Sequence, residues 1–228
     1  WELPGPMTMS FLPYAKDLPE QARAARARGH ELMLHMPMEP NGRNDPGPGA
    51  LMVSMSDAEL APGLYVAATP IGNLRDVTLR VLDVLAGCDL VLAEDTRVTG
   101  KLLAAYEISK PMQRFDEHAA ERVLPKVLSM LAEGKVIALC SDAGTPLVSD
   151  PGYRLVIAAH EQGSAVFPLP GASAVLAALV LAGLPTDRFL FAGFLPHKGG
   201  PRETALAEVR DVPGSLVFFE GPSRLQSS

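Results

Sequence analysis

The sequence is poor in cysteine, has no excess of basic residues, and contains no apolar run long enough to cross a membrane. Its two cysteines, Cys88 and Cys140, stand in apolar surroundings, which argues against a disulfide framework and for a reducing compartment. The net charge of −6 gives no general attraction to nucleic acid, so any such contact needs a local basic patch. The longest apolar stretch, Ala172–Leu184, is too short to span a bilayer. With no secretory signal visible, these absences predict a globular protein of the cytoplasm.

The sequence also lacks the motifs of several common ligand classes. No glycine-rich run ends in Gly-Lys-Ser or Gly-Lys-Thr, which argues against a phosphate-binding loop for nucleoside triphosphates. The dinucleotide pattern G-x-G-x-x-G does not follow the first strand of the regular region. Beyond Ala61 no cysteines and histidines cluster at zinc spacing, so we predict no metal site there.

The composition changes near residue 60. Seven of the nine methionines and eight of the 21 prolines lie in the first 60 residues. Beyond Ala61, short apolar runs alternate with amphipathic stretches in a regular order. We therefore predict a domain boundary at Leu60–Gly63, in a chain whose 228 residues have room for one large domain or two modest ones.

The first segment, residues 1–60, predicts one helix over residues 17–31 and one strand within residues 31–40. His30, Glu31 and His35 are candidate ligands for a divalent metal, although a surface position after a helix end is the simpler interpretation of His30. The stretch MTMSFLPYAKDLPEQARAARARGHELMLHMPMEP resembles part of the divergent polysaccharide deacetylase family. A strand and a helix of a larger fold cannot bury their faces alone, so we expect a short α/β fragment without its own activity.

From Leu64 onward, strands alternate with helices. Strands are predicted to begin near Leu64, Asp89, Lys135, Ala165, Phe189 and Ser215. Helices are predicted over residues 77–87, 98–108, 119–134, 174–184 and 203–210, and a further one ends at Gly163. We expect residues 115–118 to form a loop and Pro125 to open the third of these helices. The alternation predicts an α/β fold with a largely parallel sheet covered on both faces.

Four of these strands end in loops of unusual composition, namely TPIGN, EDTR, SDAGTP and PLPGAS. Ligands of parallel sheets bind outside the carboxyl ends of the strands. Glycines there let backbone N–H and C=O groups approach a ligand closely, and prolines reduce the entropy lost on binding. The loops therefore favour a ligand recognised mostly by backbone groups and one or two carboxylates, such as an adenosine with a neutral or zwitterionic tail.

Six ordered blocks carry a resemblance across Pro62–Leu225. They are ATPIGNLRDVTLRVL, AEDTRVTGKLL, SDAGTPLVSDPGYRLV, PLPGASAVLAAL, GLPTDRFLFAGFLP and LVFFEGPSRL. Together they resemble the 16S rRNA (cytidine-2′-O)-methyltransferases of the tetrapyrrole methylase superfamily. The resemblance implies S-adenosyl-L-methionine as cofactor, a cleft between two α/β domains, a homodimer, and 16S rRNA in the small ribosomal subunit as substrate.

On this resemblance we divide the chain into residues 1–60, an α/β methylase domain over residues 61–168, and a partial second domain over residues 169–228. Because the family continues past the last block, we expect the second domain to be truncated. Three alternatives remain open: a methylase of tetrapyrrole rings with the same fold and cofactor, a metal-dependent hydrolase that deacetylates sugars by means of residues 1–60, and an inactive chimaeric fragment.

The resemblance also implies roles for individual residues. The cofactor-binding set is Pro70, Asp142, Ala143, Gly144, Thr145, Gly171, Ala172 and Ser173. The implied catalytic set is Asn73, Asp95 and Arg97, in which a carboxylate orients or deprotonates a ribose hydroxyl and a guanidinium holds a phosphate. Each residue also has an ordinary structural interpretation, because such residues favour turns and the N-termini of helices.

Scattered basic residues suggest a contact with RNA. The implied set is Arg75, Lys101, His197, Lys198 and Arg202. Solvated surface charge is the ordinary interpretation of any one of them. Residues 61–228 carry 15 basic and 18 acidic side chains, a net charge of −3, so RNA binding would depend on a restricted basic face.

Overall fold

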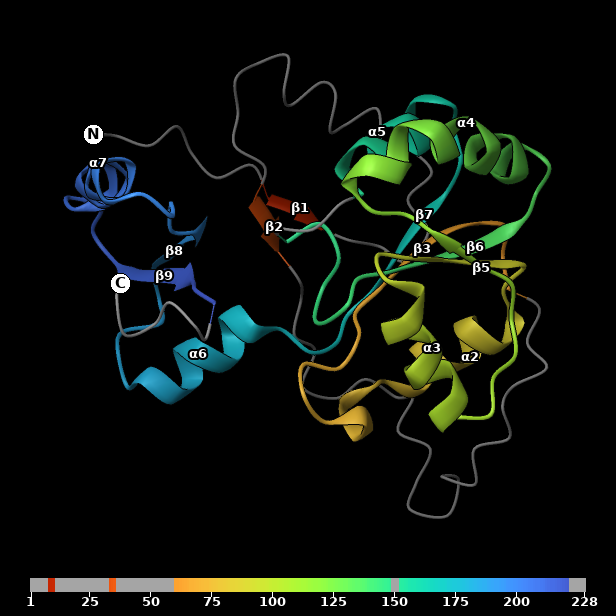
Figure 1. Cartoon of the computed structure of the whole chain (residues 1–228), viewed down its shortest axis with the longest axis horizontal. Coiled ribbons are helices and arrows are strands. Elements are labelled where there is room, and N and C mark those ends of the chain that lie inside the picture. The colour runs from red at the N-terminus through yellow and green to blue at the C-terminus, as the bar shows by residue number, and fades with distance from the viewer. Residues whose placement is uncertain (1–7, 11–32, 36–59, 149–151, 222–228) are drawn as a thin grey trace. The chain divides into compact units, whose positions relative to one another are not determined.

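The computed structural model describes residues 8–10, 33–35, 60–148 and 152–221 (Figure 1). The chain divides into two compact units, Trp1–Asp57 and Ala58–Ser228, and the division lies near the boundary predicted from composition. In the first unit, strands β1 (Thr8–Ser10) and β2 (Met33–His35) pair in parallel. The helix predicted over residues 17–31 lies outside the described residues, as do His30 and Glu31.

The second unit contains a five-stranded sheet in the order β5-β4-β6-β3-β7, with every neighbouring pair parallel. The strands are β3 (Gly63–Ala67), β4 (Leu90–Ala93), β5 (Met112–Arg114), β6 (Val136–Cys140) and β7 (Val166–Leu169). All residues of β4 and β6 are buried, as expected for central strands covered on both faces. The predicted parallel α/β sheet is confirmed.

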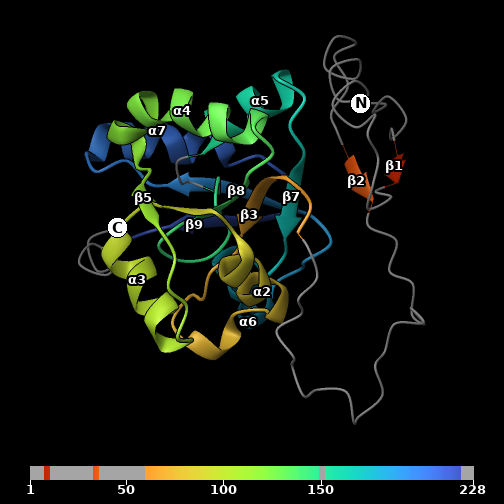
Figure 2. The same ribbon diagram turned by 90° about the vertical axis from the view of Figure 1, so that its right-hand side faces the viewer.

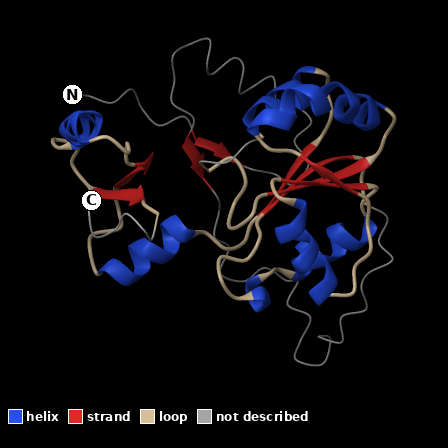
Figure 3. Cartoon of the chain, viewed as in Figure 1, coloured by secondary structure: helices blue, strands red, loops and turns tan. Residues whose placement is uncertain are grey.

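Helices cover both faces of this sheet (Figure 3). They are α2 (Leu79–Gly87), α3 (Thr96–Ala105), α4 (Glu117–Ala132) and α5 (Tyr153–Glu161). The alternation along β3 divides the core: Tyr65 packs in the cluster that contains residues of α2 and α3, and Leu64 in the cluster that contains residues of α4 and α5. The two clusters together fix the sheet between its helices.

Three of the helices that cover the five-stranded sheet begin at side chains that accept a hydrogen bond from the first turn. Thr78 begins α2, Asp95 begins α3 and Asp116 begins α4. The predicted loop over residues 115–118 was therefore too long, because the Asp116 cap starts α4 at Glu117. The expected opening at Pro125 was also wrong, since α4 continues through this residue to Ala132.

Two short elements of the second unit, β5 and η1, were not predicted, and neither was β1 of the first. Strand β5 has three residues, of which Met112 and Arg114 are exposed, so it shows no apolar pattern. The 3-10 helix η1 (Leu74–Asp76) lies in the segment expected to be a loop, and Asn73 caps it. Elements this short carry too few residues for a periodic signal.

The remaining elements are α6 (Ala174–Ala182), β8 (Phe189–Phe194), α7 (Gly199–Val209) and β9 (Ser215–Phe219). Strands β8 and β9 pair in parallel, and α6 and α7 lie on opposite sides of the pair (Figures 1 and 2). Val175 and Leu179 of α6 pack against Val217 of β9. Within the described residues, none of the helices combines the length and apolar character that a membrane crossing needs.

Candidate functional site

The carboxyl ends of four strands meet at one edge of the sheet. Ala67, the last residue of β3, is in register with Cys140 of β6 and with Leu169 of β7. Cys140 is also in register with Ala93, the last residue of β4. The four loops singled out in the sequence therefore start at the same level and side by side.

The loop after β6 binds the loop after β3. Thr69 and Gly144 exchange two backbone hydrogen bonds, with N···O distances of 2.8 and 3.0 Å. The buried hydroxyl of Thr69 donates to the carbonyl of Ser141 over 3.1 Å. Because these groups are withdrawn from water, their pairing fixes the path of residues 141–144.

The same loop also binds the loops after β4 and β7. The Asp95 N–H donates to Oδ1 of Asp142 over 2.9 Å, and the Asp142 N–H donates to Oε2 of Glu94 over 3.3 Å. The Thr145 hydroxyl donates to the carbonyl of Ala172 over 3.3 Å. Residues 141–145 are thus the centre of a hydrogen-bonded network that joins all four loops.

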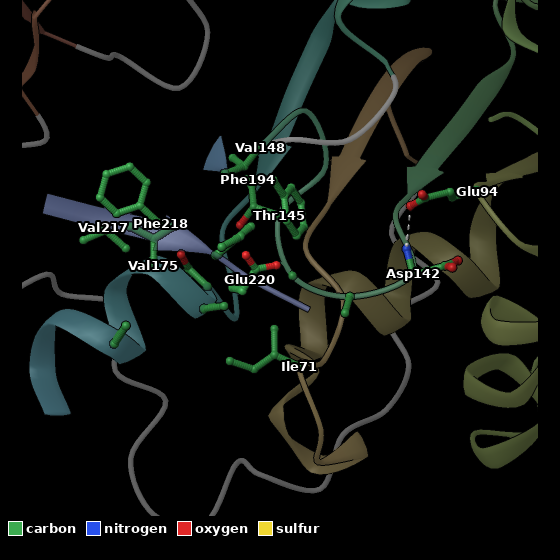
Figure 4. A pocket seen from close by; sticks show the side chains of 16 residues that line it. Ile71, Glu94, Asp142, Thr145, Val148, Val175, Phe194, Val217, Phe218 and Glu220 are labelled. Carbon is green, nitrogen blue, oxygen red and sulfur yellow. Dashed lines mark hydrogen bonds between the residues drawn. The ribbon is translucent and has the colours of Figure 1, made fainter. Parts of the chain in front are cut away.

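A cavity of about 640 Å³ opens beside this network (Figure 4). One part of its wall comes from the loops: Ile71, Glu94, Asp142, Ala143, Gly144, Thr145 and Val148. The other part comes from α6 and the ends of β8 and β9: Ser173, Ala174, Val175, Ala178, Phe194, Val217, Phe218, Phe219 and Glu220. The wall combines apolar side chains, exposed main chain and three carboxylates, a composition typical of small-molecule sites.

Two glycines allow the loops to pack closely around this cavity. Gly144 has φ of +80°, and a Cβ there would lie 3.4 Å from Cγ2 of Ile71. At Gly171 a Cβ would lie 2.9 Å from the Cβ of Ala68, closer than side chains approach in folded proteins. A side chain at Gly171 would displace the neighbouring loop, and at Gly144 it would be strained by the left-handed backbone, so both glycines are needed for the shape of the site.

The predicted cofactor-binding residues divide into two groups. Asp142, Ala143, Gly144, Thr145 and Ser173 line the cavity. Pro70, Gly171 and Ala172 lie in the loops behind its wall, where the Ala172 carbonyl accepts the bond from Thr145. Asp142 does not simply cap its own turn, because its carboxylate reaches the neighbouring loop.

The three predicted catalytic residues lie outside the cavity wall and have structural tasks. Asn73 accepts a hydrogen bond from the Arg75 N–H and caps η1. Asp95 caps α3 by accepting from the Arg97 N–H over 2.8 Å, and it also pairs with the Arg97 guanidinium. The side-chain and backbone hydrogen bonds from Arg97 hold the pKa of the Asp95 carboxyl well below its usual range. A carboxylate of such low basicity is a poor proton acceptor.

The predicted RNA-contacting residues occupy two regions. Arg75 on η1 and Lys101 on α3 are exposed, and the Tyr106 hydroxyl at the end of α3 donates to the Leu74 carbonyl, which brings the two elements together. His197 and Lys198 are exposed in the connection from β8 to α7. Arg202 is half-buried, and its guanidinium donates to the carbonyls of Pro196 and His197. These hydrogen bonds stabilise the connection from β8 to α7.

Apart from Ser173, the part of the cavity wall that comes from α6, β8 and β9 was not predicted from the sequence. Phe194 ends β8 and Glu220 directly follows β9, so both occupy the carboxyl ends of parallel strands. The rule that pointed to the first four loops applies to these two strands as well. Glu94 was recognised in the polar turn after β4, and the structure adds it to the cavity wall.

Neither cysteine is a candidate nucleophile. Burial raises the pKa of the Cys88 thiol to about 11 and that of Cys140 to about 12. Since the thiolate is the reactive form, both are inert members of the core, as their apolar surroundings predicted. Within residues 60–148 and 152–221 and the two short strands before them, no three His, Cys, Asp or Glu side chains form a potential metal site.

The sequence model of the tetrapyrrole (corrin/porphyrin) methylases matches residues 63–228. The chain therefore belongs to the tetrapyrrole methylase family, as its six sequence blocks predicted.

Among curated relatives, the ribosomal RNA small subunit methyltransferase I of Mesorhizobium japonicum is 55% identical over 169 residues, which cover 74% of this chain and 58% of the relative. The proteins of the same name from Vibrio cholerae and Escherichia coli O157:H7 are each 48% identical, over 74% and 72% of this chain and 58% of each relative. The chain thus spans somewhat more than half the length of the relatives it matches.

Solved structures confirm the fold. A diphthine synthase matches with a TM-score of 0.55 and 16% identity, covering 70% of this chain and 65% of that one. A cobalt precorrin-4 methyltransferase matches with a TM-score of 0.53 and 20% identity, covering 72% of this chain and 70% of that one. The model of the divergent polysaccharide deacetylases matches residues 1–78, which confirms the resemblance of the first segment and extends it past residue 60.

Proposed function

We propose that this protein is an S-adenosyl-L-methionine-dependent methyltransferase that methylates the ribose 2′-hydroxyl of a cytidine in 16S ribosomal RNA. The central observation is the cavity between the interlocked strand-end loops on one part of its wall and α6, β8 and β9 on the other, in a chain of the tetrapyrrole methylase family. Relatives that are 48% and 55% identical bear the name ribosomal RNA small subunit methyltransferase I, which supports ribosomal RNA as the methyl acceptor.

The cavity fits the proposed cofactor. Its volume of about 640 Å³ lies within the range of about 300–1,000 Å³ that small-molecule sites occupy. Residues 142–145 present main-chain groups at one wall, and Ser173 stands at the start of α6. Apolar side chains such as Ile71, Val175 and Phe194 offer contacts to an adenine ring. These residues would hold the cofactor, while Pro70, Gly171 and Ala172 keep the wall in place.

S-adenosyl-L-methionine supplies a methyl group that passes to the ribose oxygen, while the carbon–sulfur bond breaks, its electron pair stays on sulfur, and the hydroxyl proton is released to water. The protein's main task is then to align the hydroxyl behind the methyl carbon. Alignment of two reactants can supply roughly 7–11 kcal/mol, whereas a general base contributes about 10²–10⁴-fold in rate. The interlocked loops are suited to the first task, because their hydrogen bonds hold the wall rigid before any ligand binds.

We propose that the polar residues beside the cavity contact the RNA or hold the residues that contact it. Asp95 holds the guanidinium of Arg97 at the start of α3, where Arg97 can contact a phosphate. Asn73 keeps η1 in place, and Arg75 and Lys101 lie on neighbouring elements. His197, Lys198 and Arg202 form a second basic region. We further propose that the protein acts in the cytoplasm as a homodimer, as the family resemblance implies.

The proposed activity is tested in two steps. Calorimetric titration of S-adenosyl-L-methionine into the chain should show saturable binding. Small ribosomal subunits that lack the modification should then accept one methyl group per particle, at a cytidine whose 3′ phosphodiester becomes resistant to alkali. Transfer to a tetrapyrrole but not to RNA would favour the alternative methylase, and absence of cofactor binding would refute both.

A further inference from the structure

The turn at the end of the loop after β6 contains a leucine in a left-handed conformation. The Val148 N–H donates to the Thr145 carbonyl over 3.4 Å, so Pro146 and Leu147 are the two central residues of the turn. Leu147 has φ of +71°. A proline followed by a residue of positive φ is typical of a type II turn, in which the second central residue is usually glycine or asparagine. Leucine is strained there, because its Cβ approaches the following carbonyl oxygen.

Both ends of this turn belong to the cavity wall. Thr145 and Val148 line the cavity (Figure 4), and the Thr145 hydroxyl is bound to the Ala172 carbonyl in the loop after β7. Val148 is 36% exposed, so its side chain is available to a ligand. The conformation of the turn therefore decides where two residues of the wall lie.

The Leu147 side chain is half-buried and lies against the first residue of the next helical segment. Gly152, the N-cap of α5, is buried, and a Cβ built on it would lie 3.5 Å from Cγ of Leu147. The same Cβ would lie 2.8 Å from Cδ2 of Leu139, a core residue of β6. Leu147 thus connects the turn to the sheet and to the start of α5, and this packing maintains a backbone conformation that leucine alone would not adopt.

We propose that Leu147 is a positioning residue that holds residues 145–148 in the shape that receives S-adenosyl-L-methionine. This inference rests on the proposed function. The apolar side chain anchors the turn, and the left-handed backbone brings Val148 into the wall. The wall is therefore formed before the ligand arrives, which reduces the conformational entropy lost on binding.

The substitution Leu147→Gly tests this inference in the full chain. Glycine adopts φ of +71° without strain, so the thermal midpoint should change by less than about 4 °C. The turn loses its anchor, however, and populates other conformations. If about 10–30% of the molecules keep the receptive shape, the affinity falls roughly three- to tenfold. We expect this loss for S-adenosyl-L-methionine and S-adenosylhomocysteine alike, because both need the same wall.

Two further variants serve as controls. Among the residues that the structure describes, Glu107 is the one other non-glycine residue with a positive φ, at +55°, and it is exposed after α3, outside the cavity wall. Glu107→Gly makes the same kind of backbone change and should leave both affinities within about twofold. Leu147→Met keeps an apolar side chain of similar volume and should restore the affinity to within about twofold of the unsubstituted chain.

Calorimetry and rapid-mixing kinetics separate the outcomes. A loss in Leu147→Gly alone that lies in the association rate constant supports the inference, because only molecules with the receptive turn bind ligand. Unchanged affinity in Leu147→Gly, an equal loss in Leu147→Met, or a loss confined to the dissociation rate constant overturns the inference and leaves the proposed function standing.

A variant that does not fold has a substitute. If Leu147→Gly is unstable, Leu147→Asn replaces it, because asparagine tolerates the left-handed conformation and also removes the apolar anchor. The same loss of affinity is expected, and its absence overturns the inference. If the unsubstituted chain binds neither ligand, the proposed function fails and the inference fails with it.

Discussion

At the scale of single residues, the loops owe their geometry to polar side chains that bind main-chain groups of neighbouring loops. Asp142 binds the N–H of Asp95, and the Thr69 hydroxyl binds the carbonyl of Ser141. Asp95 in turn caps α3 and holds Arg97. These residues hold one another in place. Their loss should therefore affect the alignment of the two reactants more than it affects proton transfer.

This interpretation predicts which of two substitutions lowers the rate of methyl transfer more. Asp95→Asn keeps a good helix cap and should lower the single-turnover rate of methyl transfer by less than about tenfold. Gly144→Val places a branched side chain at φ of +80° and 3.4 Å from Ile71, and should lower the rate by more than about a hundredfold. The reverse order would assign proton abstraction to Asp95, since a general base contributes about 10²–10⁴-fold.

The capping aspartates also predict how stability depends on pH. A side-chain hydrogen bond from Arg97 lowers the pKa of Asp95, and a backbone hydrogen bond from Ala119 lowers that of Asp116, both from an ordinary value of 3.8. Groups with a lowered folded-state pKa stabilise the fold above the unfolded value, and that stabilisation is lost as pH falls below it. The thermal midpoint should therefore stay nearly constant down to about pH 5 and fall below about pH 4.

The variant Asp116→Asn serves as the comparison for this pH series. Asparagine preserves the cap on α4 but cannot titrate, so the decline of its thermal midpoint below pH 4 should be shallower than that of the unsubstituted protein. Parallel declines in the two proteins would show that Asp116 does not contribute to the acid sensitivity.

At the scale of elements, α4 runs through a proline. Pro125 is exposed and lies in the interior of Glu117–Ala132, where it cannot donate a backbone hydrogen bond to the preceding turn. The packing of Val123 and Val127 in the core maintains the helix on either side of it. Tertiary packing therefore overrides the local preference that predicted an opening.

Replacing this proline should stabilise the protein. Pro125→Ala restores the missing donor at an exposed position and should raise the free energy of unfolding by about 1–3 kcal/mol, measured by urea denaturation. The substitution Ala120→Pro, elsewhere in the same helix, provides the opposite control and should destabilise by a comparable or larger amount. A loss of stability in Pro125→Ala would mean that a kink at this residue is needed for packing.

At the scale of the whole molecule, the cavity belongs to one of the two units. The wall residues that the structure describes all lie between Ile71 and Glu220, within Ala58–Ser228. The first unit lies within the match to a different family, the divergent polysaccharide deacetylases.

A chain that begins at Ala58 should therefore bind S-adenosyl-L-methionine with a dissociation constant within about twofold of the full chain. In both proteins, ligand at about a hundred times its dissociation constant should stabilise the fold by roughly 2.7 kcal/mol, seen as a rise in the thermal midpoint. A large loss of affinity on removal of residues 1–57 would show that the first unit takes part in cofactor binding.

Most of the fold could be predicted from the amino-acid sequence alone. Apolar runs fixed the strands β3, β4 and β6, and the alternation with helices fixed their parallel pairing. Glycine and polar residues at the strand ends located one half of the cavity wall, because that chemistry is local to the loops. The short strand β5 and the helix η1 remained invisible, since three residues carry no periodic pattern.

Which polar groups contact each other became clear from the three-dimensional structure. The contact between Asp142 and Asp95 joins residues 47 positions apart, and that between Thr145 and Ala172 joins residues 27 apart. It also placed Phe194 and Glu220 in the cavity wall and kept Asp95 outside it. Such pairings depend on strand order and register, which arise from the packing of the whole sheet and leave no signal in any single segment.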